Sequence, residues 1–326
     1  MTAEFAVLGA GAIGSILAAH LARAGHSVTV IARGDRACAV QQDGLRIKGL
    51  AEFSAQVAVV TDPDQLQAVD TLIVAMKTPG TEAALERLKH VRVGAALSIQ
   101  NGVLKNELLT RAFGADRVLG ALADTSGELL PSGEVLFTRN VSLPLGELAG
   151  GISERARRIA GTIGEAGVRS SAVADILSLE WSKFTVWLGL VSMAVTTRSV
   201  SWRFLMDADC AVLLVRLTRE VAQVARAQGI DLVDGAASLP VRMILEAQEP
   251  DAVEAVRRAG EQMRSRAPHH RMSALQDLQA GRPLEVEETF GYAVRKAREL
   301  GLSVPLLETS HHLVTAIDRL RRAGTG

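Results

Sequence analysis

Three glycines near the amino terminus, Gly9, Gly11 and Gly14, constrain the fold of this 326-residue chain more than any other feature. They form the pattern G-x-G-x-x-G, which by itself is a weak signal. Here the pattern follows the apolar run 4–8, which is typical of a buried strand, and precedes a helical pattern over 13–24. This context predicts a dinucleotide-binding βαβ unit, and a plain strand-to-helix turn is the alternative.

Each glycine of this loop has a physical reason for its identity. Gly9 allows the tight turn after the strand, Gly11 lets the backbone approach a pyrophosphate, and Gly14 lets the helix pack closely on the strand. The amino-terminal end of the helix adds free N–H groups and a positive dipole end, which favour phosphate binding. The residues that we expect to bind the cofactor here are Gly9, Ala10, Gly11, Ala12, Ile13 and Gly14.

Short apolar runs alternate with helical patterns through the first half of the chain. After 4–8, the expected strands are 27–32, 57–60, 71–75 and 95–99, and the expected helices include 81–88 and 106–112. Two further strands, which could be antiparallel, are expected at 133–137 and 141–143, followed by a helix at 154–166. Such alternation predicts a parallel sheet with right-handed crossovers.

The strand pattern stops near residue 175, and only helical patterns follow. They cover 177–197, 208–228, 251–264, 287–300 and 309–322. A chain of this length should hold two domains, at roughly 100–200 residues each. The sequence therefore predicts an α/β fold with a Rossmann-type doubly wound parallel sheet in residues 1–173. An all-helical domain is expected in residues 174–326, with ligands bound in a cleft between the domains.

The charge balance argues against nucleic-acid partners. Lysine plus arginine and aspartate plus glutamate each number 36, so the formal net charge is zero, whereas a nucleic-acid binder shows a basic excess or stripe. An aromatic content of 3% also argues against stacking platforms for single strands. We therefore expect a small-molecule ligand and no nucleic acid.

Metal and membrane sites are not expected either. Cys38 and Cys210 lie far apart in the sequence, which argues against a cysteine metal cluster. The adjacent histidine pairs 269–270 and 311–312 would point about 100° apart on a helix, so neither pair chelates a metal. The apolar stretch 184–195 is shorter than the roughly 20 residues of a membrane helix. The amino terminus lacks the basic region of a secretory signal, so we expect a cytoplasmic protein.

The end of the second expected strand indicates which dinucleotide is bound. NAD enzymes usually place an acidic residue there, next to the ribose 2′-hydroxyl, but this strand runs into Arg33. A guanidinium can hold the 2′-phosphate of NADP through two parallel hydrogen bonds. The sequence therefore predicts NADPH or NADP as the cofactor. A solvated loop arginine is the alternative, and Asp35 keeps NAD open.

Lys77 and Asn101 follow two further expected strands, at the sheet edge where ligands bind in open α/β folds. We expect Lys77 to contact the cofactor. We expect Asn101 to bind the nicotinamide ribose or the substrate, although an Asn-Gly pair is also typical of a plain turn.

Several segments of the chain resemble the ketopantoate reductase (2-dehydropantoate 2-reductase) family. They are 9–21, the strand 28–33, 43–47, 101–102, 301–305 and 273–287, the last being close to the family signature S-x-L-Q-D-x-x-x-G-R-x-x-E-I/V-D/E. The resemblance covers essentially the whole chain. It implies NADPH-dependent reduction of a 2-oxo acid to a 2-hydroxy acid, such as ketopantoate to pantoate in pantothenate biosynthesis.

The resemblance also implies roles for residues in the second half. A Trp-Ser-Lys segment fits the family's W-x-K, so Lys183 would be the general acid, with a helix-surface lysine as the alternative. Glu285 would partner the lysine and the substrate, and Ser273 would help Asn101 to bind the substrate carboxylate. From the residues alone, Glu285 is typical of a solvated helix start, and Ser273 of a helix N-cap with Gln276 in a capping box.

One departure from the family concerns the choice of substrate. Family members that reduce ketopantoate carry substrate-binding asparagines four and eight residues after the lysine, where this chain has Trp187 and Val191. These spacings place both residues on the helix face of Lys183. We expect them to contact a substrate that is bulkier or more apolar than ketopantoate.

The sequence therefore predicts an NADP-dependent oxidoreductase that resembles 2-dehydropantoate 2-reductase. The first alternative is a relative in the same family that reduces a bulkier or more apolar 2-oxo acid. The second is an NADPH-binding regulatory protein without turnover, against which the presence of Lys183, Ser273 and Glu285 argues. A monomer and a homodimer are both compatible with the sequence.

Overall fold

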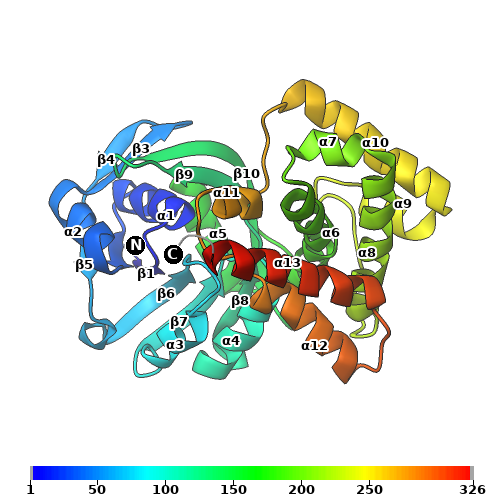
Figure 1. The fold of residues 1–326 in the computed structure, drawn as a ribbon. Helices are drawn as coiled ribbons and strands as arrows, with labels where there is room; N and C mark the ends of the chain where they lie inside the picture. Colours follow the sequence, from blue (N-terminus) through cyan, green and yellow to red (C-terminus); the bar gives the residue numbers. More distant parts are fainter. Residues whose placement is uncertain (1–2, 324–326) are drawn as a thin grey trace. The chain divides into compact units, whose positions relative to one another are not determined.

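Six parallel strands form the centre of the amino-terminal part of the chain (Figure 1). Their spatial order is β5-β2-β1-β6-β7-β8, so the chain starts in the middle of the sheet and winds outward in both directions. Counted along the chain, this is the order 3-2-1-4-5-6 of a doubly wound sheet, which confirms the predicted fold class. The strands are β1 (Glu4–Leu8), β2 (Ser27–Ile31), β5 (Ala58–Val60), β6 (Ala68–Val74), β7 (Arg92–Ser98) and β8 (Val118–Ala121).

This computed structural model describes residues 3–323 and divides into two units. The first unit ends at Ile176 and the second begins at Leu177.

Strand β1 shows why its sequence is a continuous apolar run. It pairs in parallel with both neighbours, so its two edges are occupied and both of its faces are covered. Successive side chains alternate between two hydrophobic cores: Phe5 and Val7 enter one, and Ala6 and Leu8 enter the other.

The helices of the first unit are α1 (Ala12–Arg23), α2 (Gly34–Asp43), α3 (Thr81–Glu86), α4 (Leu104–Phe113) and α5 (Glu154–Glu165). Two short 3-10 turns lie at Pro63–Gln65 and Ala115–Arg117. Helix α1 ends at Arg23, and Gly25, which was expected to stop it, lies two residues later with a φ of 89° that suits glycine. The His26 N–H then donates to the Leu21 carbonyl at 3.1 Å, which closes the helix end.

The edge of the sheet differs from the sequence prediction. Instead of two strands at 133–137 and 141–143, one long strand, β10 (Val135–Glu147), spans both. Its pairing with β9 (Asp124–Leu129) shifts register twice, around the polar stretch 138–140, so the ladder continues where the apolar pattern breaks. Five strands at this edge and beside it were not predicted: β8, β3 (Leu45–Gly49), β4 (Phe53–Ala55), β9 and β11 (Ser170–Ala172).

The second unit contains helices and, within its described residues, no strand. This confirms the predicted helical half. The helices are α6 (Ile176–Thr197), α7 (Ser201–Met206), α8 (Ala208–Arg226), α9 (Val241–Glu246), α10 (Glu249–Arg266), α11 (Ser273–Gln279), α12 (Tyr292–Glu299) and α13 (Pro305–Ala323).

Two of these helices begin differently from the prediction. The helix expected at 287–300 starts as a π-helical turn, Glu287–Gly291, before α12. The helix expected at 309–322 starts earlier, at Pro305, because proline is well suited to the first helical position. Helices α7, α9 and α11 are each too short to show a clear period in the sequence. Across residues 3–323, no helix is both long and apolar enough to cross a membrane.

Candidate active site

In the glycine loop between β1 and α1, neighbouring backbone atoms leave no room for a side chain at two of the three glycines. Gly9 has a φ of 110°, and a Cβ built there would lie 2.7 Å from the Met76 nitrogen. A Cβ at Gly14 would lie 2.1 Å from the Gly9 carbonyl oxygen. Both positions therefore exclude any side chain, for the reasons that the sequence pattern predicts.

Gly11 is different because the chain does not fill the space beside it. Its backbone is extended, with φ −71° and ψ −171°, which any residue can adopt. A Cβ there would meet only the Ala75 carbonyl oxygen, at 4.0 Å. Gly11 is also the N-cap of α1, next to the N–H groups of the first turn, which have no acceptor within the helix. The open space beside these donors fits a bound phosphate group.

Arg33 lies where the sequence places it, at the end of β2. It is the N-cap of α2 and is exposed, as is Asp35 in the first turn of that helix. Arg36, in the first turn of α2, was not singled out from the sequence. Its guanidinium donates to the Ala10 carbonyl at 2.9 Å, to Ser15 Oγ at 3.0 Å and to the Gly133 carbonyl at 2.8 Å. Arg36 thus ties α2 to the glycine loop.

The loops after β6 and β7 are joined by a side chain that sequence reasoning missed. The buried Gln100 amide nitrogen donates to the Met76 carbonyl at 2.9 Å and to Thr81 Oγ1 at 2.7 Å. The Gln100 amide oxygen accepts from Ser98 Oγ at 2.9 Å. Gln100 thereby holds the segment with the exposed Lys77 against the strand end that carries Asn101. No pattern marks such a residue, apart from its place directly after a buried strand.

Lys105 is a second residue that the sequence did not reveal. It lies in α4 and is only 5% exposed. Its ammonium donates to the Gln100 carbonyl at 3.2 Å and to the Ala121 carbonyl at 2.5 Å. Since the two carbonyls lie at the carboxyl ends of β7 and β8, Lys105 joins these strand ends directly beside Asn101.

Helix α6 carries the predicted lysine and the two residues that replace the family's asparagines. Trp187 and Val191 are buried, at 8% and 3% exposure, and Lys183 is half-buried. Trp181 packs edge-to-face on Phe184 and also contacts the ring of Tyr292, at 6.5 Å between centroids. The Trp181–Tyr292 contact joins the part of α6 that carries Lys183 to the start of α12. Tyr292 lies seven residues after Glu285.

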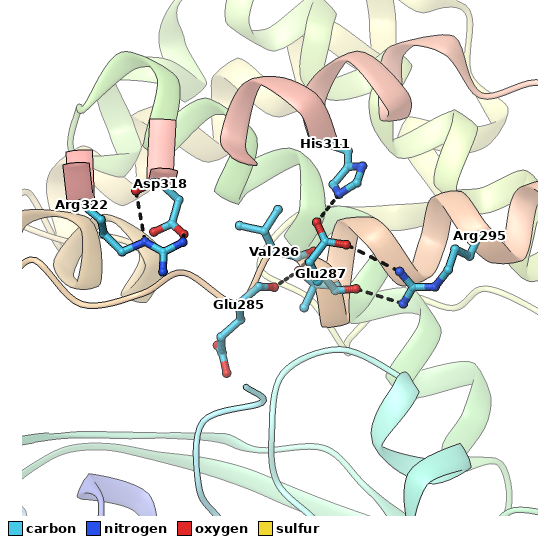
Figure 2. Close-up of polar contacts among 8 residues, drawn as sticks. Glu285, Val286, Glu287, Arg295, His311, Asp318 and Arg322 are labelled. Carbon is cyan, nitrogen blue, oxygen red and sulfur yellow. Dashed lines mark hydrogen bonds and ion pairs between the residues drawn. The ribbon is translucent and has the colours of Figure 1, made fainter. Parts of the chain in front are cut away.

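Glu285 lies in a segment between α11 and the π-helical turn that is held by α13 (Figure 2). On one side of Glu285, Asp318 Oδ1 accepts from the Leu284 N–H at 3.2 Å, and Asp318 Oδ2 pairs with Arg322 at 2.6 Å. On the other side, His311 Nε2 lies 2.9 Å from a carboxylate oxygen of Glu287.

Three further contacts, from two residues, hold this segment. Arg295 lies 3.6 Å from the Glu287 carboxylate, and it donates to the Glu287 carbonyl at 3.2 Å. Thr289 Oγ1 donates to the Glu285 carbonyl. Figure 2 shows the Glu285 carboxylate extending away from α13, whereas the Glu287 carboxylate faces His311 and Arg295.

Ser273 is not a helix N-cap. The N-cap of α11 is Met272, Ser273 is the first helical residue and is exposed, and Gln276 donates to the Arg271 carbonyl at 3.0 Å. The capping box considered for Ser273 and Gln276 is therefore wrong. Nearby, the buried Ser201 hydroxyl lies 2.8 Å from His270 Nδ1, a pair that no sequence motif predicts.

The residues expected at the site thus form two sets, one in each unit. In the first unit, Arg36 links the glycine loop to α2. Gln100 links the segment that carries Lys77 to the segment that carries Asn101. The second unit carries Lys183, Trp187 and Val191 on one helix, and holds Glu285 from α13. Among residues 3–323 no group of three or more potential metal ligands occurs.

Two family models match the chain. The model described as "Ketopantoate reductase PanE/ApbA" matches residues 5–150, and its carboxyl-terminal counterpart matches residues 175–318. The chain is 30% identical over 314 residues to a 2-dehydropantoate 2-reductase of Archaeoglobus fulgidus, covering 96% of this chain and 97% of that one. It is 31% identical over 322 residues to the enzyme of the same name from Mycobacterium tuberculosis, covering 97% and 98%.

Solved structures share the fold over nearly the whole chain. A PanE/ApbA family ketopantoate reductase from Ralstonia eutropha superposes with a TM-score of 0.82 at 25% identity, covering 98% of this chain and 99% of that one. D-mandelate dehydrogenase, in a ternary structure with NADH and anilino(oxo)acetate, gives a TM-score of 0.82 at 19% identity, covering 97% and 99%.

Proposed function

Because the chain belongs to the ketopantoate reductase family, we propose that it reduces a 2-oxo acid to a 2-hydroxy acid with NADPH. In this proposal, residues 1–173 hold the dinucleotide, and residues 174–326 supply the proton donor and most substrate contacts. The observation that carries the proposal is the glycine loop. The chain fills the space at Gly9 and Gly14 but leaves it open at Gly11, beside the first turn of α1.

The first unit fits a nicotinamide dinucleotide. The N–H groups at the start of α1 would bind the pyrophosphate, and Arg33 would bind the 2′-phosphate that distinguishes NADPH from NADH. Lys77 would add a second positive charge. Asn101 would donate or accept hydrogen bonds at the nicotinamide ribose or the substrate carboxylate. When bound, a reduced nicotinamide supplies the hydride that reaches the ketone carbon.

The second unit supplies the proton. We assign Lys183 as the general acid: its ammonium would donate a hydrogen bond to the ketone oxygen and then release a proton to the developing alkoxide. Glu285 would hold the ammonium in place and bind the substrate. Ser273 would bind the substrate carboxylate together with Asn101.

A substrate bulkier or more apolar than ketopantoate is the second candidate. The observation that favours it is the burial of Trp187 and Val191, four and eight residues after Lys183. A substrate hydroxyl placed against such side chains would have no hydrogen-bond partner there, at a cost of about 1–3 kcal/mol. The D-mandelate dehydrogenase neighbour holds anilino(oxo)acetate, but at 19% identity its likeness concerns the fold.

The test is a panel of 2-oxo acids with NADPH, in which the absorbance of NADPH is followed. The panel includes ketopantoate, branched aliphatic acids and aromatic acids. Turnover of at least one acid is expected, and Lys183→Ala should lower kcat by about 10²–10⁴-fold while the NADPH Kd stays unchanged. Lys89→Ala, which removes an exposed lysine paired with Glu86, is the matched control.

The outcomes separate the parts of the proposal. Unchanged turnover in Lys183→Ala would contradict the lysine assignment. Tight NADPH binding without turnover of any acid would contradict a reductase. A higher kcat/KM for ketopantoate than for every bulkier acid would remove the second candidate.

A further inference from the structure

The Arg36 guanidinium is held by hydrogen bonds beside the glycine loop, but among the described residues it has no acidic partner there. All three acceptors of its guanidinium are neutral: the Ala10 carbonyl inside the glycine loop, Ser15 Oγ in the first helical turns of α1, and the Gly133 carbonyl in the β9–β10 turn. The side chain is half-buried. Within residues 3–323, no carboxylate lies within ion-pair distance of it.

A second arginine increases the positive charge at this point. Arg46 donates to the Ser132 carbonyl at 2.6 Å, one residue before the carbonyl that Arg36 binds. Burial and the neighbouring Arg46 lower the pKa of Arg36. Glu134, the nearest acidic residue along this turn, is instead paired with Lys48 at 2.9 Å.

This arrangement leaves a positive charge beside the phosphate-binding end of α1. A partly buried guanidinium without a counter-charge is costly, and a bound anion would offset that cost. The forked guanidinium has five N–H donors, of which three are used, so donors remain for a phosphate oxygen.

We propose that Arg36 is a phosphate-binding residue of the dinucleotide site, in addition to Arg33. This inference rests on the proposed function, because it takes the bound anion to be a dinucleotide phosphate. Two phosphate groups could be the partner: the pyrophosphate, which NADPH and NADH share, and the 2′-phosphate of NADPH alone. Arg36 also joins the β9–β10 turn to the bound anion through Gly133.

The experiment compares NADPH and NADH binding by nicotinamide fluorescence at several salt concentrations. The variants are Arg36→Gln, which removes the charge, Arg36→Lys, which keeps it, and Arg33→Ala. Arg158→Gln, on the exposed side of α5, is the control. Arg36→Gln should weaken binding of at least one dinucleotide by tenfold or more and flatten the dependence of Kd on salt. Arg36→Lys should keep the salt dependence, and Arg158→Gln should change neither quantity.

The pattern of loss identifies the phosphate. Equal weakening of NADPH and NADH would assign Arg36 to the pyrophosphate, and weakening of NADPH alone would assign it to the 2′-phosphate. A Kd within twofold of the wild type for both dinucleotides would overturn the proposal. So would weaker binding with an unchanged salt dependence, because that is the result expected of a purely structural tether.

A measurement on the wild type keeps the test independent of variant folding. Inorganic pyrophosphate and adenosine 2′,5′-bisphosphate are the probes, and hydrogen exchange of residues 130–137 is the readout. At least one probe should slow exchange in the β9–β10 turn, and no change with either would count against the proposal. Tight NADPH binding by the wild type with no effect of Arg36→Gln would refute this inference alone and leave the reductase proposal standing.

Discussion

At the scale of single residues, the three glycines of the loop have different physical reasons for being glycine. At Gly14 the reason is steric, because a Cβ there would lie only 2.1 Å from the Gly9 carbonyl oxygen. At Gly11 the chain imposes no such limit, since the nearest atom is 4.0 Å away and the backbone is extended. Packing therefore gives no reason for glycine at position 11, and the proposed function supplies one, the close approach of a bound dinucleotide.

Substitution with alanine separates these two reasons. Gly14→Ala should lower the free energy of unfolding by about 2 kcal/mol or more, because the backbone must shift to relieve the contact. Gly11→Ala should change it by less than about 1 kcal/mol, the scale of an N-cap change, yet weaken NADPH binding at least tenfold. Chemical unfolding and a binding titration measure both quantities. Wild-type NADPH affinity in Gly11→Ala would show that the loop does not contact the cofactor.

At the scale of elements, the segment around Glu285 depends on a helix distant in sequence. Asp318 is 7% exposed and accepts the Leu284 N–H, so α13 fixes the backbone one residue before Glu285. The Glu287 contacts with His311 and Arg295 fix it two residues after. In the proposed function the Glu285 carboxylate must meet the Lys183 ammonium, and such support would help it, because a misplacement of about 1 Å can lower the rate about 10²-fold.

Two variants of Asp318 test this positioning. Asp318→Ala should leave the Leu284 N–H without its acceptor, which costs about 1–3 kcal/mol of stability, and should lower kcat severalfold. Asp318→Asn keeps an oxygen for that N–H and should retain most of kcat. The NADPH Kd should stay unchanged in both, because the first unit is untouched. If the Ala variant lost stability but kept the wild-type kcat, Asp318 would support the fold without positioning Glu285.

At the scale of the whole molecule, the sequence predicts best those elements whose pattern is local. The run 4–8, the helix of α1 and the long helix α6 each carry their own period, and all were predicted within one or two residues. Strands β3 and β4 were missed because they are short and sit at the edge of the sheet. β4 pairs with β3, and β3 is joined to the sheet through β10, which lies far away in the sequence.

The same limit applies to the candidate site. Arg33 and Lys183 can be predicted as site residues because their neighbours mark them: Arg33 follows the second strand, and Lys183 stands in a Trp-Ser-Lys segment. Arg36 and Lys105 could not, because their partners lie up to 97 residues away along the chain. The hydrogen-bond partners of these two side chains are brought to them only when the sheet folds, so no local sequence pattern marks either residue.

The stability of the first unit should depend on pH through a residue that connects distant parts of it. His20 in α1 is buried between Phe53 and Phe137, and its Nδ1 donates to the Ala166 carbonyl at 2.8 Å. The other ring nitrogen, Nε2, is buried and has no hydrogen-bond partner within the described residues. Burial therefore lowers the pKa of His20 below its ordinary value of 6.5.

Because the unfolded chain takes up this proton more readily than the folded one, the contribution of His20 is complete above pH 6.5. It is lost as the pH falls from 6.5 toward the lowered pKa of the folded state. Between pH 7.5 and 5.5, the wild type should lose more stability than His20→Asn, whose amide can still donate to Ala166 but does not titrate. Hydrogen exchange of α1 is the suitable readout, because Trp181, Trp187 and Trp202 all lie in the second unit and report its unfolding instead. Equal pH dependence in the two proteins would mean that the buried imidazole of His20 does not govern acid sensitivity.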